Sequence, residues 1–378
     1  MKYPDPTSLQ HTGKEHRVGQ GLVGAIETSV TYQSGDVSDP PVYSRLGNTS
    51  NHKELESVLA LLEGSDAAIA TGSGMSAFNL LFQALLRPGD HIVVQDCCYG
   101  GTHHYIDNIL RPWGVSATFA TIRDWPGAMR AETKMAVFES ISNPFCEPQD
   151  VLAAVAACRA ANVISVCDNT FASPVLCRPL QYGTDLVVES ATKYLNGHSD
   201  VIAGLVAGRT DLMAALRKIH PYLGSFLPPQ QCAQLLRGLK TLSLRVRQHT
   251  ENGAAFAHFM RDARDVVSHV HYGAESAGIQ SCFQNGFGGM VTVRFKDCVD
   301  VPSLMRKMKL VSDVPSLGGT ESTATMPYFT TNWFMDDAAK KRLGIDTQVV
   351  RFSIGLEAPG DIAHDVLSAA RSTTRTPK

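Results

Sequence analysis

The chain lacks the long apolar run that a membrane-spanning helix needs, and its charges nearly cancel. No stretch approaches the roughly 18 consecutive apolar residues of a transmembrane helix, and the first twenty residues are polar, without the apolar core of a signal peptide. The 34 lysines and arginines against 36 aspartates and glutamates leave a net charge of -2. This balance gives no electrostatic reason to bind nucleic acid or an anionic membrane. We therefore expect a cytoplasmic protein without either partner.

The nine cysteines and thirteen histidines also lack the spacing of a disulfide framework or a metal site. The cysteines are scattered, odd in number and mostly inside apolar runs such as VISVCD (163–168). Neither the adjacent Cys97 and Cys98 nor the adjacent His103 and His104 match the spacing of known zinc ligands. The sequence predicts buried thiols, surface imidazoles and no metal.

The 378 residues, 44% hydrophobic and 19% charged, are typical of a soluble globular enzyme with a substantial core. Apolar, β-branched runs alternate with segments of helical periodicity, which indicates parallel βαβ units and a doubly wound α/β sheet. Strands are expected at 67–71, 91–96, 115–120, 135–140, 163–168 and 185–190, and helices at 52–63, 76–86, 104–110 and 153–161.

The pattern changes after about residue 235. A long helical stretch at 230–263 leads into a region where 289–295 and 349–357 read as antiparallel strands. We predict an extended N-terminal arm (1–45), a mostly parallel large domain (46–240) and a smaller α+β C-terminal domain (241–378).

The segment TGSGMSA (71–77) leaves its ligand open. Gly72, Gly74 and Ala77 match G-x-G-x-x-A between a strand and a helix, and Asp96 ends the next strand 22 residues after Gly74. This pattern is close to a dinucleotide fingerprint. Small residues at a helix N-terminus expose N–H groups that favour an anion. The anion could be a pyrophosphate or a single phosphate, and a tight turn without a ligand is a third interpretation.

The stretch SATKYLNGHSD (190–200) places Lys193 just after the apolar run DLVVE. A desolvated ammonium is costly, so Lys193 either reaches solvent or is a neutral nucleophile. Asp168 ends the preceding buried strand, 25 residues earlier, and the carboxyl ends of parallel strands meet at the edge where ligands bind. Pyridoxal phosphate needs this set: a lysine for a Schiff base, a carboxylate for the pyridine nitrogen, and a helix N-terminus with hydroxyls such as those of Ser190 and Thr192 for the phosphate. Nicotinamide chemistry has no use for a lysine and an aspartate placed in this way.

At this point the sequence resembles a known family, the Cys/Met-metabolism enzymes of pyridoxal-phosphate fold type I. The family includes cystathionine γ-synthase, cystathionine γ- and β-lyases, methionine γ-lyase and the homoserine-ester sulfhydrylases. Nine blocks carry the resemblance in order: YSRLGN (43–48), SGMSA (73–77), DCCYGGT (96–102), SNP (142–144), DNTFASP (168–174), SATKYLNGHSD (190–200), RGLKTL (237–242), SLGGTES (316–322) and RFSIGLE (351–357).

The resemblance implies a role for each matching residue. Lys193 would carry the cofactor and move protons, and Tyr99 would stack on the ring and take a proton from the substrate amine. Cofactor contacts would come from Tyr43, Arg45, Gly74, Met75, Tyr99, Asp168, Ser190, Thr192 and Lys193. Substrate contacts would come from Asn143, Ser316 and Arg351, with Arg351 holding the α-carboxylate. Tyr43 and Arg45 would reach the phosphate of a neighbouring subunit, which implies a dimer as the minimal active unit and a homotetramer as the expected assembly.

The sequence departs from the family where the substrate would bind. Pro315 stands where cystathionine-specific members carry Glu, and Thr330-Thr331-Asn332 replaces the usual T-H segment. We expect γ-elimination on an L-amino acid such as cystathionine, methionine or a homoserine derivative, with release of a 2-keto acid and ammonia. The alternative is a γ-replacement synthase in specialised biosynthesis. A nicotinamide oxidoreductase and a catalytically silent scaffold are the competing hypotheses from other classes.

Overall fold

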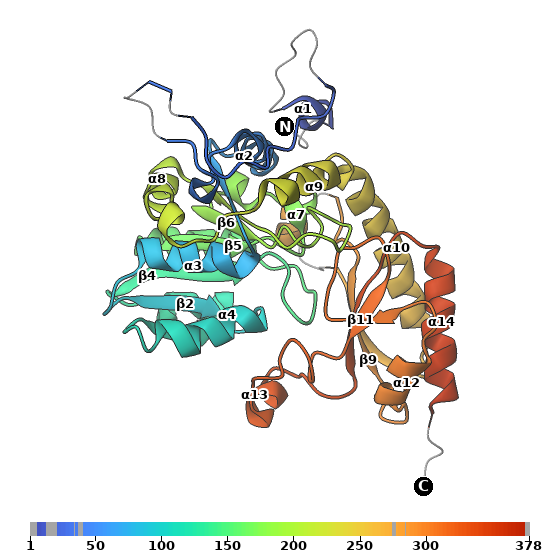
Figure 1. Cartoon of the computed structure of the whole chain (residues 1–378). Helices are drawn as coiled ribbons and strands as arrows, with labels where there is room; N and C mark the ends of the chain where they lie inside the picture. The colour runs from blue at the N-terminus through green and yellow to red at the C-terminus, as the bar shows by residue number, and fades with distance from the viewer. Residues whose placement is uncertain are drawn as a thin grey trace.

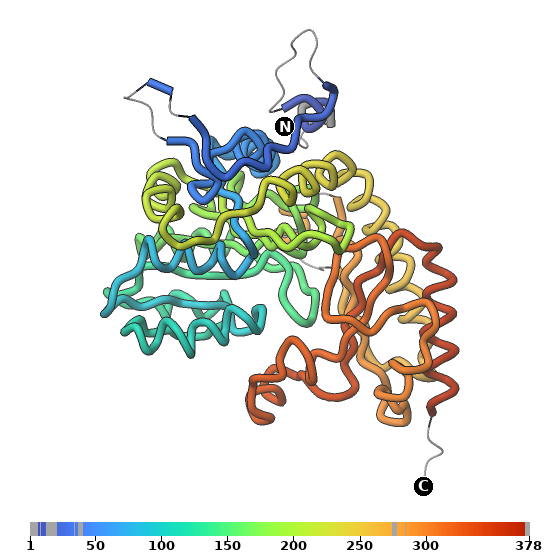
Figure 2. The backbone as a smooth tube through the Cα atoms, in the orientation of Figure 1, coloured from blue at the N-terminus to red at the C-terminus, as the bar shows by residue number. Residues whose placement is uncertain are grey.

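Two sheets of different size lie side by side in the structure (Figure 1). It is a computed structural model that describes residues 6–12, 21–33, 35–36, 41–273, 277–283 and 285–374. Figure 2 shows that the larger, N-terminal part and the C-terminal part meet along one side of the molecule. The tail 375–378 and, within the N-terminal arm, residues 1–5, 13–20, 34 and 37–40 lie outside the described residues.

The larger sheet has seven strands in the order β1-β7-β6-β5-β4-β2-β3. Five neighbours from β3 to β6 pair in parallel, as the alternating sequence pattern predicts. The strands are β1 (Ala68–Thr71), β2 (His91–Gln95), β3 (Ser116–Ala120), β4 (Thr133–Glu139), β5 (Ile164–Asp168), β6 (Leu186–Glu189) and β7 (Gly204–Gly208).

β7, which pairs antiparallel with both β6 and β1, is not among the strands predicted from the sequence. β7 follows β6 through a compact loop, residues 190–203, rather than through a crossover helix. A connection without a crossover returns the chain in the opposite direction, so the strand is antiparallel. The same loop contains Lys193, which is why the site lies beside this reversal.

Helices cover both faces of the large sheet. One face packs against α3 (Gly74–Leu85), α4 (Gly100–Tyr105) and α8 (Thr210–Ile219). The other packs against α2 (Ser50–Glu63), α6 (Val151–Ala161) and α9 (Pro229–Leu239). Because strands such as β2 and β7 are buried at every residue, their sequences are continuous apolar runs rather than alternating ones.

The helical stretch predicted at 230–263 is two helices, α9 and α10 (Leu242–Asp262), separated at Lys240 and Thr241. The Thr241 N–H bonds to the Gly238 carbonyl, which closes a tight turn between them. α10 begins in the large core and ends in the smaller one, where Phe256 and Met260 pack. The domain boundary at residues 240–241 remains our proposal.

The smaller sheet has five strands in the order β10-β11-β12-β9-β8, packed against α10, α12 (Val301–Lys307) and α14 (Pro359–Ser372). β9 and β12 pair antiparallel, as predicted, with Arg351 opposite Thr292. β12 ends at Ser353, four residues before the predicted end. The strands are β8 (Val267–His271), β9 (Met290–Phe295), β10 (Ser312–Asp313), β11 (Thr323–Thr325) and β12 (Val349–Ser353).

Short elements complete the described chain. The helix predicted at 104–110 begins earlier, as α4, and continues as a π-helical turn at Ile106–Leu110. The remaining α-helices are α1 (Pro6–His11), α5 (Trp125–Ala128), α7 (Ser173–Leu176), α11 (Ala277–Cys282) and α13 (Asp337–Arg342). Among the described helices, none has the length and apolarity required to span a bilayer.

Candidate active site

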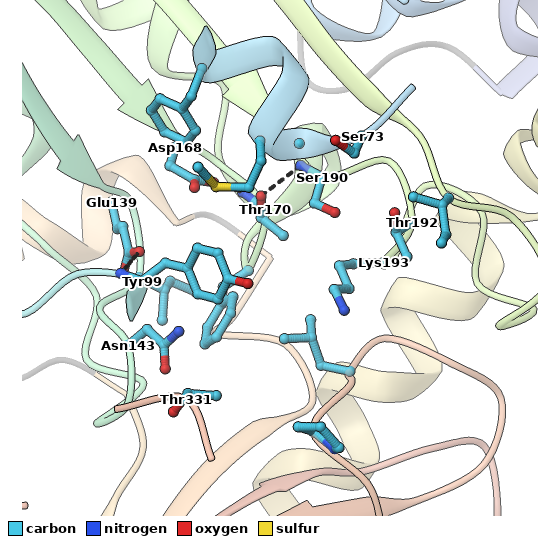
Figure 3. Close-up of a pocket in the computed structure, with 18 of the residues that line it drawn as sticks. Ser73, Tyr99, Glu139, Asn143, Asp168, Thr170, Ser190, Thr192, Lys193 and Thr331 are labelled. Atoms are coloured by element: carbon cyan, nitrogen blue, oxygen red, sulfur yellow. Dashed lines mark hydrogen bonds between the residues drawn. The ribbon is translucent and has the colours of Figure 1, made fainter. Parts of the chain in front are cut away.

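A cavity of about 260 Å³ lies between the carboxyl ends of the large sheet's strands and loops of the smaller domain (Figure 3). The large domain contributes Asp168 and Lys193 to its lining, whereas the smaller domain contributes Pro315, Thr331 and Arg351. The sequence placed the lysine and the aspartate at one edge of the sheet, and the structure brings both into this cavity.

Lys193 lies in the turn that follows β6, and its side chain points into the cavity (Figure 3). Its Nζ donates a hydrogen bond to Ser316 Oγ at 3.2 Å. Burial lowers the pKa of Lys193 to about 8, and the nearby positive charge of Arg351 contributes to this lowering. A large fraction of this amine is therefore unprotonated at mildly alkaline pH, which is the form that acts as nucleophile and base.

Asp168 is the last residue of β5, and its carboxyl lines the cavity. Its Oδ1 accepts a hydrogen bond from the Thr170 N–H at 3.0 Å. Burial raises the pKa of Asp168, and no cationic side chain within the described ranges pairs with it. A buried carboxylate without a cation is costly, so this position favours a cationic ligand group such as a protonated ring nitrogen.

The N-terminus of α3 forms the upper wall of the cavity, with Ser73, Gly74 and Met75 in the lining. Ser73 caps the helix by accepting the Ser76 N–H at 3.0 Å. Gly74 lies against Ser190, because a Cβ at position 74 would come within 3.0 Å of the Ser190 Cβ. Only a residue without a side chain lets this helix end approach the loop so closely, and the exposed N–H groups suit a phosphate.

Ser190 and Thr192 complete the wall opposite Gly74. The Ser190 N–H donates to Thr170 Oγ1 at 2.8 Å, the bond drawn in Figure 3. The Thr192 hydroxyl donates to the Ala203 carbonyl and accepts the Ala203 N–H. Thr192 therefore also fastens the start of the Lys193 turn to the residue before β7.

Arg351 comes from the middle of β12 and is 2% exposed. Its Nη1 donates to Asn143 Oδ1 at 2.8 Å, and its guanidinium lies 5.5 Å from the centre of the Phe171 ring. The Thr292 hydroxyl donates to the Pro144 carbonyl at 2.6 Å beside this contact. A buried guanidinium facing a cavity is suited to a carboxylate, which it binds through two N–H groups at once.

Tyr99 precedes α4 and is 41% exposed, with its ring projecting into the cavity (Figure 3). Burial raises the pKa of Tyr99. Its backbone N–H donates to Glu139 Oε1 at 2.5 Å. Glu139 also lines the cavity, and the sequence analysis missed it; its signal was an apolar strand, 133–139, that ends on a carboxylate just as 163–168 does.

Three of the residues assigned by resemblance lie outside the cavity lining. Ser316 lies between the lining residues Pro315 and Leu317, and its hydroxyl accepts the hydrogen bond from Lys193. Tyr43 lies in the arm, and the Arg45 guanidinium stands 5.3 Å from its ring centre. Arg45 Nη1 donates to the Pro221 carbonyl at 2.7 Å. Within one chain neither reaches the phosphate position, so their predicted role requires a neighbouring subunit.

The residues present fit pyridoxal phosphate. Lys193 is the partly neutral amine, Asp168 the uncompensated buried carboxyl, and the closely packed Gly74–Ser190 wall the phosphate cradle. Within the part of the chain that the structure describes, no three His, Cys, Asp or Glu side chains gather as metal ligands do.

This fold and cavity define the class of fold type I pyridoxal-phosphate enzymes. Residues 7–371 match the family described as Cys/Met metabolism PLP-dependent enzyme, and the chain belongs to that family. The predictions of family, fold class and cofactor are confirmed. The chain is therefore a pyridoxal-phosphate-dependent enzyme with lyase or synthase chemistry on a small amino-acid substrate.

Relatives with three different activities resemble the chain over nearly its full length. The cystathionine β-lyase of Coxiella burnetii is 36% identical over 384 residues, which cover 96% of this chain and 97% of the relative. The cystathionine γ-lyase of Lactobacillus plantarum, solved with L-serine, has a TM-score of 0.92 at 31% identity and 98% coverage of both chains. The cystathionine γ-synthase of Xanthomonas oryzae pv. oryzae, solved with cystathionine, has a TM-score of 0.91 at 30% identity, covering 97% of this chain and 98% of that chain.

Proposed function

We propose that the enzyme eliminates the γ-substituent of an L-amino acid and releases a four-carbon 2-keto acid, ammonia and the protonated leaving group. The observation that carries this proposal is the position of Lys193. Its amine has a pKa of about 8 and is held by one hydrogen bond, to Ser316. An amine of this kind would be able to move protons at both Cα and Cβ of the substrate, which γ-elimination requires.

Arg351 and Asn143 would orient the substrate for these proton transfers. The guanidinium has donors left after its bond to Asn143 and can bind the α-carboxylate by a bidentate contact. A carboxylate held by Arg351 would place the amino acid in the cavity that Lys193 also lines, within which its α-hydrogen would have to face this amine. Holding the substrate in this orientation lowers the entropic cost of bringing its α-hydrogen to the base.

When bound, pyridoxal phosphate supplies the electron sink that makes the α-hydrogen acidic. Asp168 supports that chemistry with a negative charge at the end of β5. Tyr99 covers the cavity on its open side. Because burial raises its pKa, Tyr99 is a neutral phenol that can donate a hydrogen bond, and acceptance of a proton from the incoming amine would require its phenolate form. Balanced over one turnover, the amino acid and one water give the keto acid, ammonia and the leaving group with its proton.

The products test this proposal directly. O-acetyl-L-homoserine and L-methionine should each give 2-oxobutanoate and an equal amount of ammonia, measured by chromatography and an ammonia assay. Release of pyruvate from cystathionine would indicate β-elimination instead. A drop in keto-acid yield with the appearance of a replaced amino acid when cysteine is added would favour the γ-replacement synthase.

Among the described residues that line the cavity, none on the smaller domain's side, which would face the γ-substituent, carries a negative charge. The two carboxyls in the cavity lining, Glu139 and Asp168, both lie at strand ends of the large sheet. On the smaller domain's side the lining residues include Pro315, Leu317 and Thr331. Asp313 and Glu321, the nearest acids in sequence, lie outside the lining, and Glu321 accepts the Thr320 hydroxyl. This wall favours an uncharged γ-substituent.

We therefore expect kcat/KM for L-cystathionine to be about tenfold to a hundredfold below that for O-acetyl-L-homoserine or L-methionine, because the distal ammonium of cystathionine would be desolvated without a partner. Pro315→Glu should narrow this gap, whereas the neutral Pro315→Gln should not. A wild-type preference for cystathionine, with equal effects of the two variants, would contradict an uncharged distal wall.

We also propose that two subunits share each site. The exposed apolar side chains of Leu22, Val23, Ile26 and Val30 lie in the extended arm, and Arg45 lies outside the cavity lining of its own chain, where it donates to the Pro221 carbonyl. A neighbour that packed against this arm would cover the apolar residues and bring Arg45 to its cavity. A dimer is then the smallest active unit, and a tetramer of two such dimers remains the expected assembly.

Arg45→Ala is expected to weaken cofactor binding about tenfold or more through loss of a charge-assisted contact, whereas the exposed Arg123→Ala should not. If Arg45 acts across the interface, an equimolar mixture of Arg45→Ala and Lys193→Ala subunits should regain about a quarter of wild-type activity. Half of the dimers are then mixed, and each mixed dimer has one intact site. No gain, despite subunit exchange shown by mass spectrometry, would place Arg45 outside a shared site.

A further inference from the structure

β4 ends on a buried carboxyl for which the chemistry above has no use. Glu139 is 6% exposed and pairs in register with Asp168 across the parallel strands β4 and β5. Paired residues on parallel strands project to the same side of the sheet, so two carboxyls stand next to each other at the bottom of the cavity. Both belong to its lining.

The Glu139 carboxyl contacts the two loops that form the substrate side of the cavity. Its Oε1 accepts the Tyr99 N–H at 2.5 Å, and the backbone N–H of Asn143 also interacts with the carboxyl. Asn143 in turn accepts the Arg351 guanidinium at 2.8 Å. Glu139 thus lies between the residue whose ring covers the cavity and the pair that would hold the substrate carboxylate.

The other oxygen of Glu139, Oε2, is buried and has no hydrogen-bond partner among the described residues. A buried carboxylate oxygen without a donor is costly, whereas a protonated one can itself donate to a group in the cavity. The main-chain N–H of Glu139 is already bonded to Gln95 Oε1 at 2.9 Å, which fixes the strand end itself.

The charges around Glu139 favour its neutral form. It faces Asp168 from β5, Arg351 from β12, Cys146 from the loop after β4, and Cys97, Cys98 and Tyr99 from the loop after β2. Burial, followed by the negative charge of Asp168, raises the pKa of Glu139 well above its usual range. The N–H bonds from Tyr99 and Asn143, and then the charge of Arg351, only partly oppose this effect. Neighbouring buried carboxyls do not both ionise, and the one that faces a cationic ligand keeps the charge.

We propose that Glu139 is a positioning residue, held as a neutral acid, that fixes the Tyr99 and Asn143 backbones and thereby sets where the Tyr99 ring and the Arg351 guanidinium stand. It leaves the negative charge of the pair on Asp168, opposite the pyridine nitrogen. This role depends on the cofactor alone and holds whichever amino acid the enzyme cleaves.

Two variants and one control test the proposal on the enzyme loaded with pyridoxal phosphate. Glu139→Gln keeps an acceptor for the Tyr99 N–H and a donor where the acid carries its proton. Glu139→Leu has a similar size and offers neither. Ser140→Ala removes the next side chain, a buried hydroxyl without a partner within the described residues that does not line the cavity.

The readouts are the visible circular dichroism of the bound cofactor, the pH midpoint of its visible band, and KM against kcat. We expect Glu139→Leu to lose most of the visible dichroism, because the stacked ring is no longer held, and to raise KM about tenfold. Glu139→Gln should retain the dichroism and move the pH midpoint by less than about half a unit. Ser140→Ala should match the wild type in all three.

A Glu139→Leu enzyme with wild-type dichroism and KM would overturn the positioning role. If that variant does not fold, Glu139→Gln decides alone. If Glu139 were ionised, its charge would stabilise the protonated form of the cofactor linkage, and Glu139→Gln would lower the pH midpoint. A fall of more than about one unit would therefore overturn the proposal that Glu139 is neutral. Dichroism and midpoint are measured without substrate, so they stand apart from the outcome of the elimination assays.

Discussion

Lys193→Ala is expected to lower kcat by at least about 10³-fold, since a positioned acid–base group alone contributes about 10²–10⁴-fold and the covalent link to the cofactor is lost as well. The amine lies in the cavity, and no other lysine shares the cavity's lining among the described residues. Keto-acid release from O-acetyl-L-homoserine measures the loss. The variant should bind pyridoxal phosphate only as the free aldehyde, with a changed visible spectrum that borohydride does not fix to the protein.

The fold should not suffer from this change. The folded state lowers the pKa of Lys193 from its usual value to about 8, so the charged amine costs stability below pH 8 and its removal relieves that cost. The melting temperature of Lys193→Ala without cofactor should equal or exceed that of the wild type. Lys134→Ala, at an exposed position of β4, is the matched control and should keep full activity. Turnover near the wild-type rate in Lys193→Ala would rule out this lysine as the essential base.

Asp168→Asn is expected to slow α-proton exchange on the order of 10²-fold or more, because it keeps the side chain's shape and removes the charge that holds a proton on the pyridine nitrogen. The exchange is followed by NMR of the amino acid in deuterated water, which reports the first proton transfer without depending on the leaving group. Cofactor affinity should also fall, since the cationic nitrogen would lose the anionic neighbour at that strand end.

Stability again separates a chemical effect from a structural one. Burial raises the pKa of Asp168, so its charged form costs stability at neutral pH, and the neutral asparagine should melt at the same temperature or higher. Asp361→Asn removes a charge from an exposed position in the first turn of α14 and should leave exchange unchanged. Wild-type exchange in Asp168→Asn would assign the pyridine contact to another group.

The residues at strand ends can be placed from the sequence because one rule covers them. Apolar runs that end in a parallel sheet deliver their next side chains to a common edge, and this rule alone predicts that Asp168 and Lys193 lie together. The same rule applied to the run ending at Glu139 predicts that this carboxyl joins them. Glu139 was not predicted as a site residue because the usual set of cofactor contacts includes only one carboxyl.

Contacts between distant segments could not be predicted in this way. The bond between Arg351 and Asn143 joins residues 208 positions apart, one in β12 of the smaller sheet and the other in the loop after β4 of the larger sheet, and no local pattern encodes it. The antiparallel β7 was missed because GLVAG is short and has glycine at both ends, which sequence rules assign to turns. The break between α9 and α10 was missed for the opposite reason, since Lys240 and Thr241 carry no strong helix-breaking signal. The assembly, the cellular compartment and the roles of individual site residues remain predictions.

Because Arg351 contacts Asn143 across the two halves of the chain, binding of the cofactor and binding of the amino acid should respond differently when the two halves separate. Within one chain, the residues suited to the cofactor come from the large domain, at β5, α3 and the loop after β6, whereas Arg351, which is suited to a carboxylate, belongs to the other sheet. An amino acid that binds Arg351 must displace or share a bond that already ties the two halves together. Cofactor affinity should therefore depend on the large domain and, through Arg45, on a neighbouring subunit, while the Michaelis constant should depend on how the two halves of one chain are docked. A solvent or substitution that weakens the contact between Thr292 and Pro144 would leave a protein that still binds the coloured cofactor but binds its amino acid poorly.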